Sequence, residues 1–389
     1  MKKSVLSVAL VGGAALLAAC GTTGGDPVAA PSSAPSSAAS SAPANPTVPV
    51  PAGLDVGGYP TKARTITVSA QRSWVAEGNR MGDEALIQAD EVDPRLTMGG
   101  AALRSYPIVE TAGLNTRVPD ATAAAFGAND FRVGMTTTRG DALKDPNVAV
   151  RIGLYRFDTD EAAKKAAEAV RTATAGARPV KVTVDGAPEV IASEFKPGTV
   201  DAYVVQGPFV VNVSGTGPST DQGAQFVTKA LGLELPKLKG FTPTPVGKIQ
   251  TLDIDKDGIL SRTLPQSNQA EAALFENWYD LAGYKHRVAD ISNLGTITAA
   301  GVDLVGQAGS VVYRTRDAAA ATTMVQTAAS KNPAVAGIPQ LPAVKCMSGG
   351  DRTYCWMPVG RYVASVDDTN AAVARQKAAA QFSILATTP

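Results

Sequence analysis

Few side chains of the kinds that carry out catalysis occur in this sequence. His286 is the only histidine among the 389 residues, and Lys285 and Arg287 flank it. A single histidine excludes a metal site built from two histidines, and no Gly-x-Ser-x-Gly segment offers a serine nucleophile beside it. A histidine between two cations is expected at a solvated surface. The sequence therefore predicts a protein that is not an enzyme and that carries no cofactor.

The string Asp253-Ile-Asp255-Lys-Asp257-Gly is the segment most similar to a metal site. Calcium loops of the EF-hand type place carboxylates at positions 1, 3 and 5, a glycine at position 6 and a bidentate glutamate at position 12. Position 12 is Leu264 here, and residues 248–252 are expected to form a strand where an EF-hand has a helix. We interpret the string as an Asp-rich turn, with a calcium-binding or sensory role as an alternative.

Carboxylates leave a second alternative open, which is hydrolysis by a pair of acidic side chains. Such pairs cannot be recognised from spacing, because the two residues can come from distant parts of a chain. The acidic residues considered for this envelope hydrolase are Glu77, Asp93 and Asp303.

The first cysteine ends a segment with the features of a lipoprotein signal. Lys2 and Lys3 precede an uncharged apolar run that is too short for a stable membrane span. The run ends Leu-Ala-Ala-Cys20-Gly, which matches the lipobox of bacterial lipoprotein precursors. We predict a signal peptide over residues 1–19 and a diacylglycerol anchor on Cys20, because two acyl chains hold a protein stably on a membrane. The expected location is the outer face of the cytoplasmic membrane, in the cell envelope.

Two further cysteines, Cys346 and Cys355, suit an exported protein. If they face each other in a hairpin, Gly350 and Asp351 form a two-residue loop of favourable composition. Directly opposed strand residues are close enough for a disulfide. A metal pair would need more ligands nearby, and a redox pair usually has the Cys-x-x-Cys spacing. A structural disulfide is the prediction.

Aromatic residues surround this predicted hairpin. Tyr354 and Trp356 flank Cys355, and Tyr362 follows on the next predicted strand. These three side chains could line a ligand groove, or they could form one face of a core.

Composition separates a tether from the part that can fold. Residues 21–52 consist almost wholly of Ala, Ser, Pro, Gly and Thr, so residues 20–52 are expected to form a lipidated, disordered tether. Removal of the signal peptide takes away two lysines and changes the formal net charge from +1 to −1. A near-neutral chain gives no indication of a nucleic-acid partner.

An internal duplication organises the remaining residues into an N-terminal domain, 53–238, and a C-terminal domain, 239–389. The stretch Ile-Gly-Leu-Tyr155-Arg156-Phe-Asp before one Ala-rich helix corresponds to Val-Val-Tyr313-Arg314-Thr-Arg-Asp before another. A predicted hairpin and a helix follow in both halves, and Val204 is expected where the second half has Cys355. The first half carries about 40 additional residues, placed around 96–141. The predicted fold class is α+β, with two related halves, each a mostly antiparallel sheet with packed helices.

Start and stop signals mark several of the predicted helices, such as Asp158 and Thr220 at starts and Gly176 and Gly232 at ends. Those in the first half cover residues 73–86, 158–174 with Asp158 as N-cap, and 220–232. Those in the second half cover residues 271–282, 318–330 and 369–385.

Several short segments resemble a family of envelope lipoproteins from mycolic-acid-containing actinobacteria whose domain has no known function. They are Gly53-Leu-Asp-Val-Gly-Gly-Tyr59-Pro60, Glu77-Gly-Asn-Arg80-Met81 with Glu91-Val-Asp93-Pro94, Asp257-Gly-Ile-Leu-Ser-Arg262 and Gly360-Arg-Tyr362-Val-Ala364. The resemblance covers nearly all of the expected exported part. It implies a two-part envelope lipoprotein, and it brings no catalytic residues with it.

These observations favour a membrane-anchored, non-enzymatic binding or interaction module. Its expected partners are the membrane, through the anchor, and an unidentified ligand or protein of the envelope.

Overall fold

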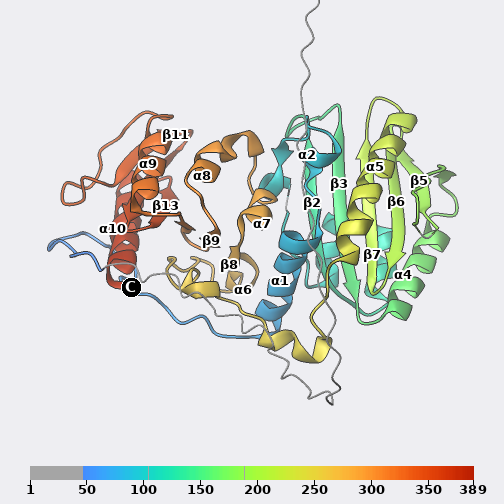
Figure 1. Ribbon diagram of the computed structural model, residues 1–389, viewed down its shortest axis with the longest axis horizontal. Helices are drawn as coiled ribbons and strands as arrows, with labels where there is room; N and C mark the ends of the chain where they lie inside the picture. The colour runs from blue at the N-terminus through green and yellow to red at the C-terminus, as the bar shows by residue number, and fades with distance from the viewer. Residues whose placement is uncertain (1–46, 104, 188) are drawn as a thin grey trace, which may run out of the picture. The chain divides into compact units, whose positions relative to one another are not determined.

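The computed structural model describes residues 47–103, 105–187 and 189–389 (Figure 1). The predicted signal peptide, Cys20 and the tether up to residue 46 lie outside these residues. Contacts between residues group Ala44–Pro389 into one compact unit, which contains every sheet described below. This unit has hydrophobic cores of its own, so it is expected to fold by itself.

The first half runs from helix α1 to helix α5. Within the described residues, its strands form a sheet in the order β1-β2-β3-β7-β6-β5-β4, with every neighbouring pair antiparallel. Its elements are α1 (Ala70–Arg80), η1 (Met81–Ala85), α2 (Ala89–Val92), β1 (Met98–Gly99), η2 (Gly100–Leu103), η3 (Thr111–Thr116), α3 (Asp120–Gly127), β2 (Phe131–Gly140), β3 (Ala149–Phe157), α4 (Asp160–Ala173), β4 (Arg178–Pro179), β5 (Ile191–Lys196), β6 (Thr199–Gln206), β7 (Phe209–Thr216) and α5 (Thr220–Lys239).

The second half runs from η4 to α10. Its described strands form a second antiparallel sheet, in the order β11-β12-β13-β10-β9-β8. Its elements are η4 (Val246–Thr251), η5 (Lys256–Gly258), α6 (Ala272–Phe275), β8 (Asn277–Tyr279), α7 (Leu281–Lys285), η6 (Ile291–Leu294), α8 (Gly295–Ala299), β9 (Leu304–Gln307), β10 (Val311–Arg314), α9 (Ala318–Ala329), β11 (Lys345–Gly349), β12 (Arg352–Val359), β13 (Tyr362–Asp368) and α10 (Ala371–Thr387).

The two halves share one topology, which confirms the α+β class and the duplication. Five neighbouring strands of the first sheet have the order β2-β3-β7-β6-β5. The corresponding strands of the second sheet, numbered along the chain, have the same order, β9-β10-β13-β12-β11. Helices α4 and α9 follow the second strand of each set, and α5 and α10 follow the last. The register agrees as well, because Tyr155 pairs with the second residue of β7 and Tyr313 with the second residue of β13.

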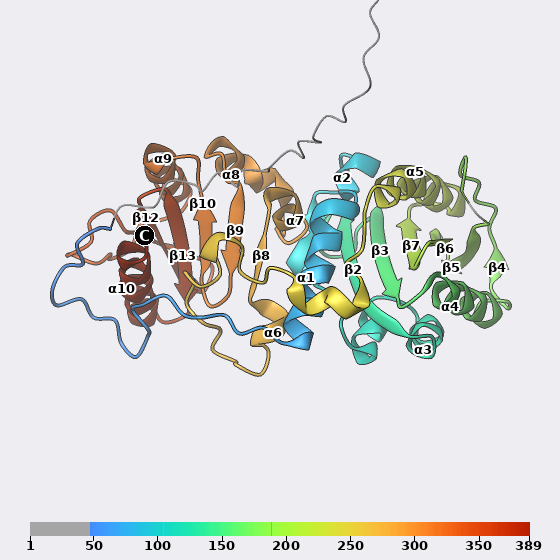
Figure 2. The same ribbon diagram turned by 60° about the horizontal axis from the view of Figure 1, so that its bottom comes forward.

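Each sheet lies between helices, as Figure 2 shows for α4 and α5 and for α9 and α10. Strand residues alternate between the two faces, so each sheet contributes to two cores. In the second half, Met357 and Ala364 pack with α10, whereas Tyr313 and Val363 pack with α9. This alternation decides which aromatic side chains can meet in one site.

The disulfide belongs to the second sheet and has no counterpart in the first. Cys346 and Cys355 pair directly across β11 and β12, with 4.1 Å between their Cα atoms, and they form the predicted disulfide. In the first sheet the same positions are Ala192 and Ala202, which pair across β5 and β6. The expectation that Val204 corresponds to Cys355 is wrong by two residues, because Val204 pairs with the third residue of β7 and so corresponds to Met357.

Several helix boundaries differ from the predicted ones. Thr159, whose side chain accepts the Ala162 N–H, is the N-cap of α4 in place of Asp158. Helix α5 continues past Gly232 to Lys239, since Leu235 and Leu238 still pack into the core. Residues 248–252 fall mainly in the 3₁₀ helix η4 and not in a strand.

The predicted helix over residues 271–282 is wrong. The structure divides it into α6, the strand β8 and the start of α7. Strand β8 pairs with β9, and the side chains of Asn277 and Tyr279 are buried there. Pairing with an existing sheet edge outweighs the local helical preference of this segment.

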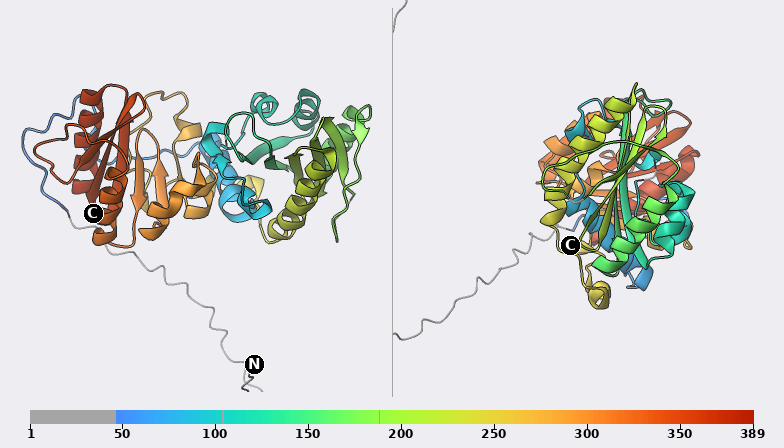
Figure 3. Two further views of the ribbon diagram at one scale, coloured as in Figure 1. Left: turned by 90° about the horizontal axis from the view of Figure 1, so that it is seen from above. Right: turned by 90° about the vertical axis from the view of Figure 1, so that its right-hand side faces the viewer.

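The segment before α1 lies on the second half, although most of it falls within the predicted N-terminal domain (Figure 3, left). The Val48 N–H donates to the Ala386 carbonyl at 2.9 Å, and the Gln376 amide donates to Asp55 at 3.0 Å. Tyr59 packs against the core that α10 covers. Residues 47–52, the described end of the expected tether, therefore begin the folded part.

Candidate functional site

A candidate site is a cavity of about 600 Å³ in the second half, which we call the aromatic cavity. Its volume lies in the range of sites that bind small molecules. Side chains of strands β10, β11 and β12 form one wall. Residues of α7, η6, α8 and the end of α9 form the other. The lining residues are Tyr284, Val288, Asn293, Leu294, Thr296, Ile297, Tyr313, Ala328, Lys331, Asn332, Met347, Gly349, Tyr354 and Trp356.

Three of the four aromatic side chains that line this cavity contact one another. The rings of Tyr313 and Trp356 are stacked, with 5.7 Å between centroids and 12° between planes. Tyr284 meets Tyr313 edge to face, also at 5.7 Å. Their hydroxyls bond each other at 2.8 Å, and burial together with this contact raises the pKa of Tyr284 well above its ordinary range. Since the two hydroxyls satisfy each other, the rings offer mainly apolar surface to the cavity.

Two of the three predicted groove residues lie in this cavity. Tyr354 and Trp356 stand two residues apart on β12, so their side chains point to the same face of the sheet. Tyr362 lies on the opposite face, where it is buried in the core beneath α10 with Arg262 against its ring at 5.2 Å. The prediction that Tyr362 lines the groove is wrong, because side chains alternate along β13 and Tyr362 points to the other face of the sheet.

Tyr284, Tyr313 and Lys331 are site residues that no sequence pattern indicates. The repeat had marked Tyr313 as the counterpart of Tyr155, but it carried no information about an open space beside it. Tyr284 comes from α7, and Lys331 follows the end of α9. Only the packing of these helices against the sheet brings the three side chains together.

The first half fills the corresponding place with a side chain. By register, Tyr155 and Tyr203 correspond to Tyr313 and Trp356. Phe126 of α3 is fully buried against both, at 4.9 Å and 6.5 Å between ring centroids. The second half has the five-residue helix α8 in the same place in the chain order, and it contributes Ile297. A smaller side chain on a shorter helix leaves the aromatic wall accessible.

The disulfide holds the hairpin that carries this wall. Strands β11 and β12 supply Met347, Tyr354 and Trp356 to the cavity, and the disulfide joins the same two strands from the opposite face. We expect the double substitution Cys346→Ala and Cys355→Ala to lower the free energy of unfolding by roughly 2–3 kcal/mol, the value for closing so short a loop. Alanines occupy these positions in the first sheet, so they suit the backbone. Denaturation of both forms, with and without reductant, measures the effect, and equal stability of the two oxidised proteins would contradict it.

The Asp-rich turn uses its carboxylates within the chain. Asp253 accepts the Asp255 N–H at 3.0 Å, and Asp255 accepts the N–H groups of Leu260 and Ser261. Asp257 forms an ion pair with Arg314 at 2.7 Å. The candidate calcium ligands Asp253, Asp255 and Asp257 therefore do not converge on one point. Within the described residues, no three side chains of the metal-binding types are grouped to hold an ion.

The three acids considered for hydrolysis are separate ion pairs. Glu77 is buried and bonded to Arg156 and Arg80, Asp93 pairs with Arg95, and Asp303 pairs with Arg314. None of the three lines the aromatic cavity. The structure does not bring any two of them together as an acid–base pair.

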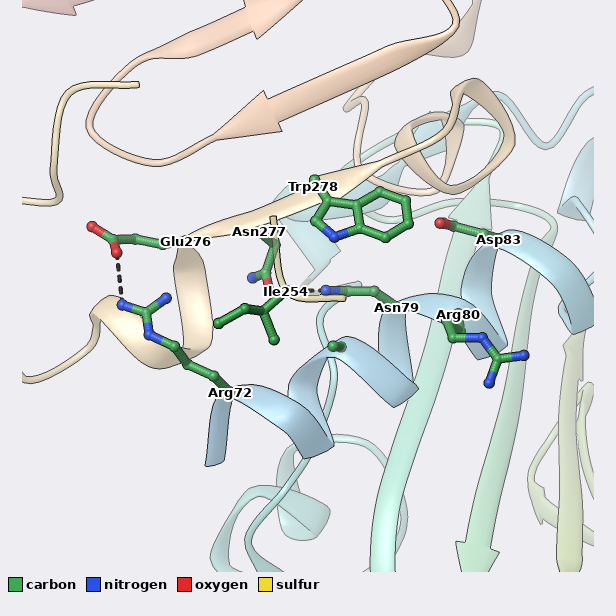
Figure 4. Close-up of a pocket in the computed structure, with 9 residues that line it drawn as sticks. Arg72, Asn79, Arg80, Asp83, Ile254, Glu276, Asn277 and Trp278 are labelled. Carbon is green, nitrogen blue, oxygen red and sulfur yellow. Dashed lines mark hydrogen bonds and ion pairs between the residues drawn. The ribbon is translucent and has the colours of Figure 1, made fainter. Parts of the chain in front are cut away.

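Polar side chains form contacts between the two halves (Figure 4). Arg72 of α1 bonds Glu276 at 2.8 Å, and Asn79 donates to Asn277 at 2.9 Å. The space between these residues is about 10 Å³, which corresponds to a single water molecule. This pocket lies between residues of the two halves and is too small for an organic ligand.

His286 is part of this contact, and the prediction of a solvated histidine is wrong. Its side chain is fully buried, and its Nε2 lies 3.0 Å from Gln88 Nε2 of the first half. Gln88 Nε2 also donates to the Ala282 carbonyl, so it acts as a donor and the imidazole accepts. Burial, with Arg287 nearby, lowers the pKa of His286 from 6.5 to about 3.

The low pKa of His286 predicts loss of stability in acid. The imidazole stays neutral in the folded state while the unfolded chain takes up a proton below pH 6.5, so stability present above that pH falls as the pH drops toward 3. The chain has one histidine, so a single NMR titration curve reports it. A midpoint near 6.5 in the folded protein would contradict the buried position.

No helix among the described residues is both long and apolar enough to cross a membrane.

Comparisons with known proteins agree with the division into halves. Residues 66–254 match the model described as domain of unknown function (DUF7373) N-terminal, and residues 259–388 match the model of its C-terminal part. A search of curated proteins found no significant match. Among solved structures, the extracellular domain of PknH from Mycobacterium tuberculosis is similar at 14% identity and a TM-score of 0.27, with 39% of this chain and 93% of that chain covered. The two family matches follow each other along most of the chain, and the chain belongs to the DUF7373 family.

Proposed function

We propose that this protein is a lipid-anchored, extracytoplasmic binding module that holds a small molecule in the aromatic cavity of its second half. The observation that carries the proposal is the difference between two halves of one topology. One half closes the place beside its paired aromatic residues with Phe126, and the other leaves about 600 Å³ open there. Filling the space beside this half-buried aromatic wall would stabilise the fold, so a space left open there indicates use by a ligand.

The location rests on other features. The signal-like segment and Cys20 suit a lipoprotein of the actinobacterial envelope, as the resemblance of the sequence suggests. The Cys346–Cys355 disulfide suits an oxidising compartment outside the cytoplasm. Radiolabelled palmitate incorporated by the wild type and not by Cys20→Ser would support the anchor, and equal labelling of both would refute it.

The test of binding uses a substitution that fills the aromatic cavity with a phenylalanine ring, as Phe126 fills the corresponding place in the first half. Ile297→Phe places an aromatic ring in the aromatic cavity, and Thr298→Phe places the same ring on an exposed position of the same helix. The compact unit 44–389, exported so that its disulfide forms, is purified without detergent, and native mass spectrometry records bound molecules. We expect wild type and Thr298→Phe to retain a ligand and Ile297→Phe to lose it. A molecule retained equally by all three would place the binding site elsewhere.

A further inference from the structure

The charges around the aromatic cavity define the class of ligand that it would take. Lys331 is the one charged side chain among the described residues that line it. Its Nζ lies 3.1 Å from Thr296 Oγ1, which directs the ammonium group across the rim between α9 and α8. The remaining polar lining residues, Asn293, Thr296 and Asn332, are uncharged. The rim therefore combines neutral hydrogen-bonding groups with one cation.

A second lysine lies on the same face of the sheet. Lys345 pairs with Trp356 across β11 and β12, so both side chains point to the side of the cavity. Lys345 is exposed at this edge of the sheet. Both lysines lie on the side of the aromatic wall, and each contributes a positive charge there.

Two carboxylates adjoin the lining residues, and each is already bonded. Asp290 accepts the N–H and hydroxyl of Ser292 at the start of η6. Asp367, which pairs with Tyr354 across β12 and β13, forms an ion pair with Arg352 at 2.5 Å. Asp290 has neutral donors and Asp367 has Arg352 as its ion partner, so Lys331 remains available to an anion at the rim.

The matching surface of the first half has a different charge pattern. The pocket beside Tyr203, the counterpart of Trp356, is lined by both acids and bases, which are Asp160, Lys164, Glu168, Arg171 and Glu189. Arg171 bonds both Glu168 and Glu189 there, so the charges are paired within the protein. The contrast shows that the positive rim is a property of the second half and not of the shared topology.

We infer that the ligand of the aromatic cavity is an amphipathic anion, with an apolar body against Tyr313, Trp356 and Ile297 and a carboxylate or phosphate head beside Lys331. This inference rests on the proposed function, because it names the ligand of the same cavity. An apolar body replaces water on the aromatic and aliphatic walls, and an anionic head forms a charge-assisted hydrogen bond with the ammonium group. A cationic head would meet like charge at the rim.

The experiment uses four probes that share a decyl chain, all below their micelle concentrations: decanoate, decyl phosphate, decanol and decyltrimethylammonium. Binding to unit 44–389 is followed by tryptophan fluorescence and calorimetry. We expect at least one anion to bind about tenfold more tightly than the alcohol and the ammonium probe. The two anions distinguish a carboxylate ligand from a phosphate ligand.

Substitution at Lys331 tests the origin of this preference. Lys331→Ala is expected to weaken binding of the anion about tenfold without changing the affinity for the alcohol. Lys331→Glu is expected to increase the affinity for the ammonium probe. Lys165→Ala, at an exposed position of α4, is the matched control and should change neither. Binding of all four probes with equal affinity, abolished by Ile297→Phe, would overturn the anionic class and leave the cavity as a binding site. Binding of no probe, with no ligand retained in native mass spectra, would overturn the proposed function itself.

Discussion

Replacing Glu77 with alanine is expected to destabilise the fold by about 3–5 kcal/mol, the cost of leaving the buried Arg156 without its partner. Glu77 is fully buried in α1. Its carboxylate bonds Arg156, accepts from Arg80 at 3.0 Å and accepts the N–H of Thr244 at 2.9 Å. These contacts join the first helix, the centre of the first sheet and the chain between the two halves. Their simultaneous loss explains the size of the expected effect.

Glu84 provides a matched control for this experiment. It pairs with the same Arg80 at 3.0 Å, but its side chain is half exposed. Glu84→Ala is expected to cost less than about 1 kcal/mol, because exposed ion pairs contribute little. Chemical denaturation of both variants measures the difference. If the two substitutions proved equally mild, the buried network around Glu77 would not be a determinant of stability.

Replacing Glu234 with glutamine is expected to stabilise the protein at pH 8 by roughly 3–5 kcal/mol. Glu234 is fully buried in α5, where its carboxyl accepts the Ile87 N–H at 2.9 Å. Burial raises the pKa of this carboxyl from 4.5 to about 8. Between these values the unfolded chain loses the proton while the folded protein keeps it, so stability falls as the pH rises from 4.5 to 8. Glutamine keeps the shape and the acceptor oxygen without the ionisable proton.

The measurement compares the two proteins at several pH values. Below pH 4.5 the wild type and Glu234→Gln are expected to be similarly stable, and the difference should grow up to pH 8 and then remain constant. Comparison of the two curves removes the opposite contribution of His286, since both proteins contain it. A difference that does not depend on pH would show that Glu234 ionises normally in the fold.

The local sequence was sufficient to predict most of the repeated elements. Alternating residues around Tyr155 and Tyr313 marked β3 and β10, and Asp317 was a recognisable start for α9. The prediction failed where a segment was recruited to a sheet edge, as in β8. It failed also at Gly232, where core contacts of the following leucines continue a helix beyond a residue that usually ends one.

The candidate site shows the same division. Spacing alone predicted the Cys346–Cys355 disulfide, because each cysteine lies the same number of residues from the two-residue loop and the two are therefore opposed. It also identified Tyr354 and Trp356 as neighbours on one face. It could not exclude Tyr362, since the face to which the next strand turns a residue depends on the register between strands.

The amino-acid sequence by itself determined the export-like start, the division into two α+β halves and the disulfide, because these follow from composition and short-range periodicity. Only the tertiary structure decided which half has the aromatic cavity. That difference arises from the packing of α3 with Phe126 in one half and of the shorter α8 in the other, on sheets of the same topology. The positive rim likewise depends on where the chain after α9 places Lys331. Contacts between residues distant in the chain decide such features, and spacing along a sequence does not contain them.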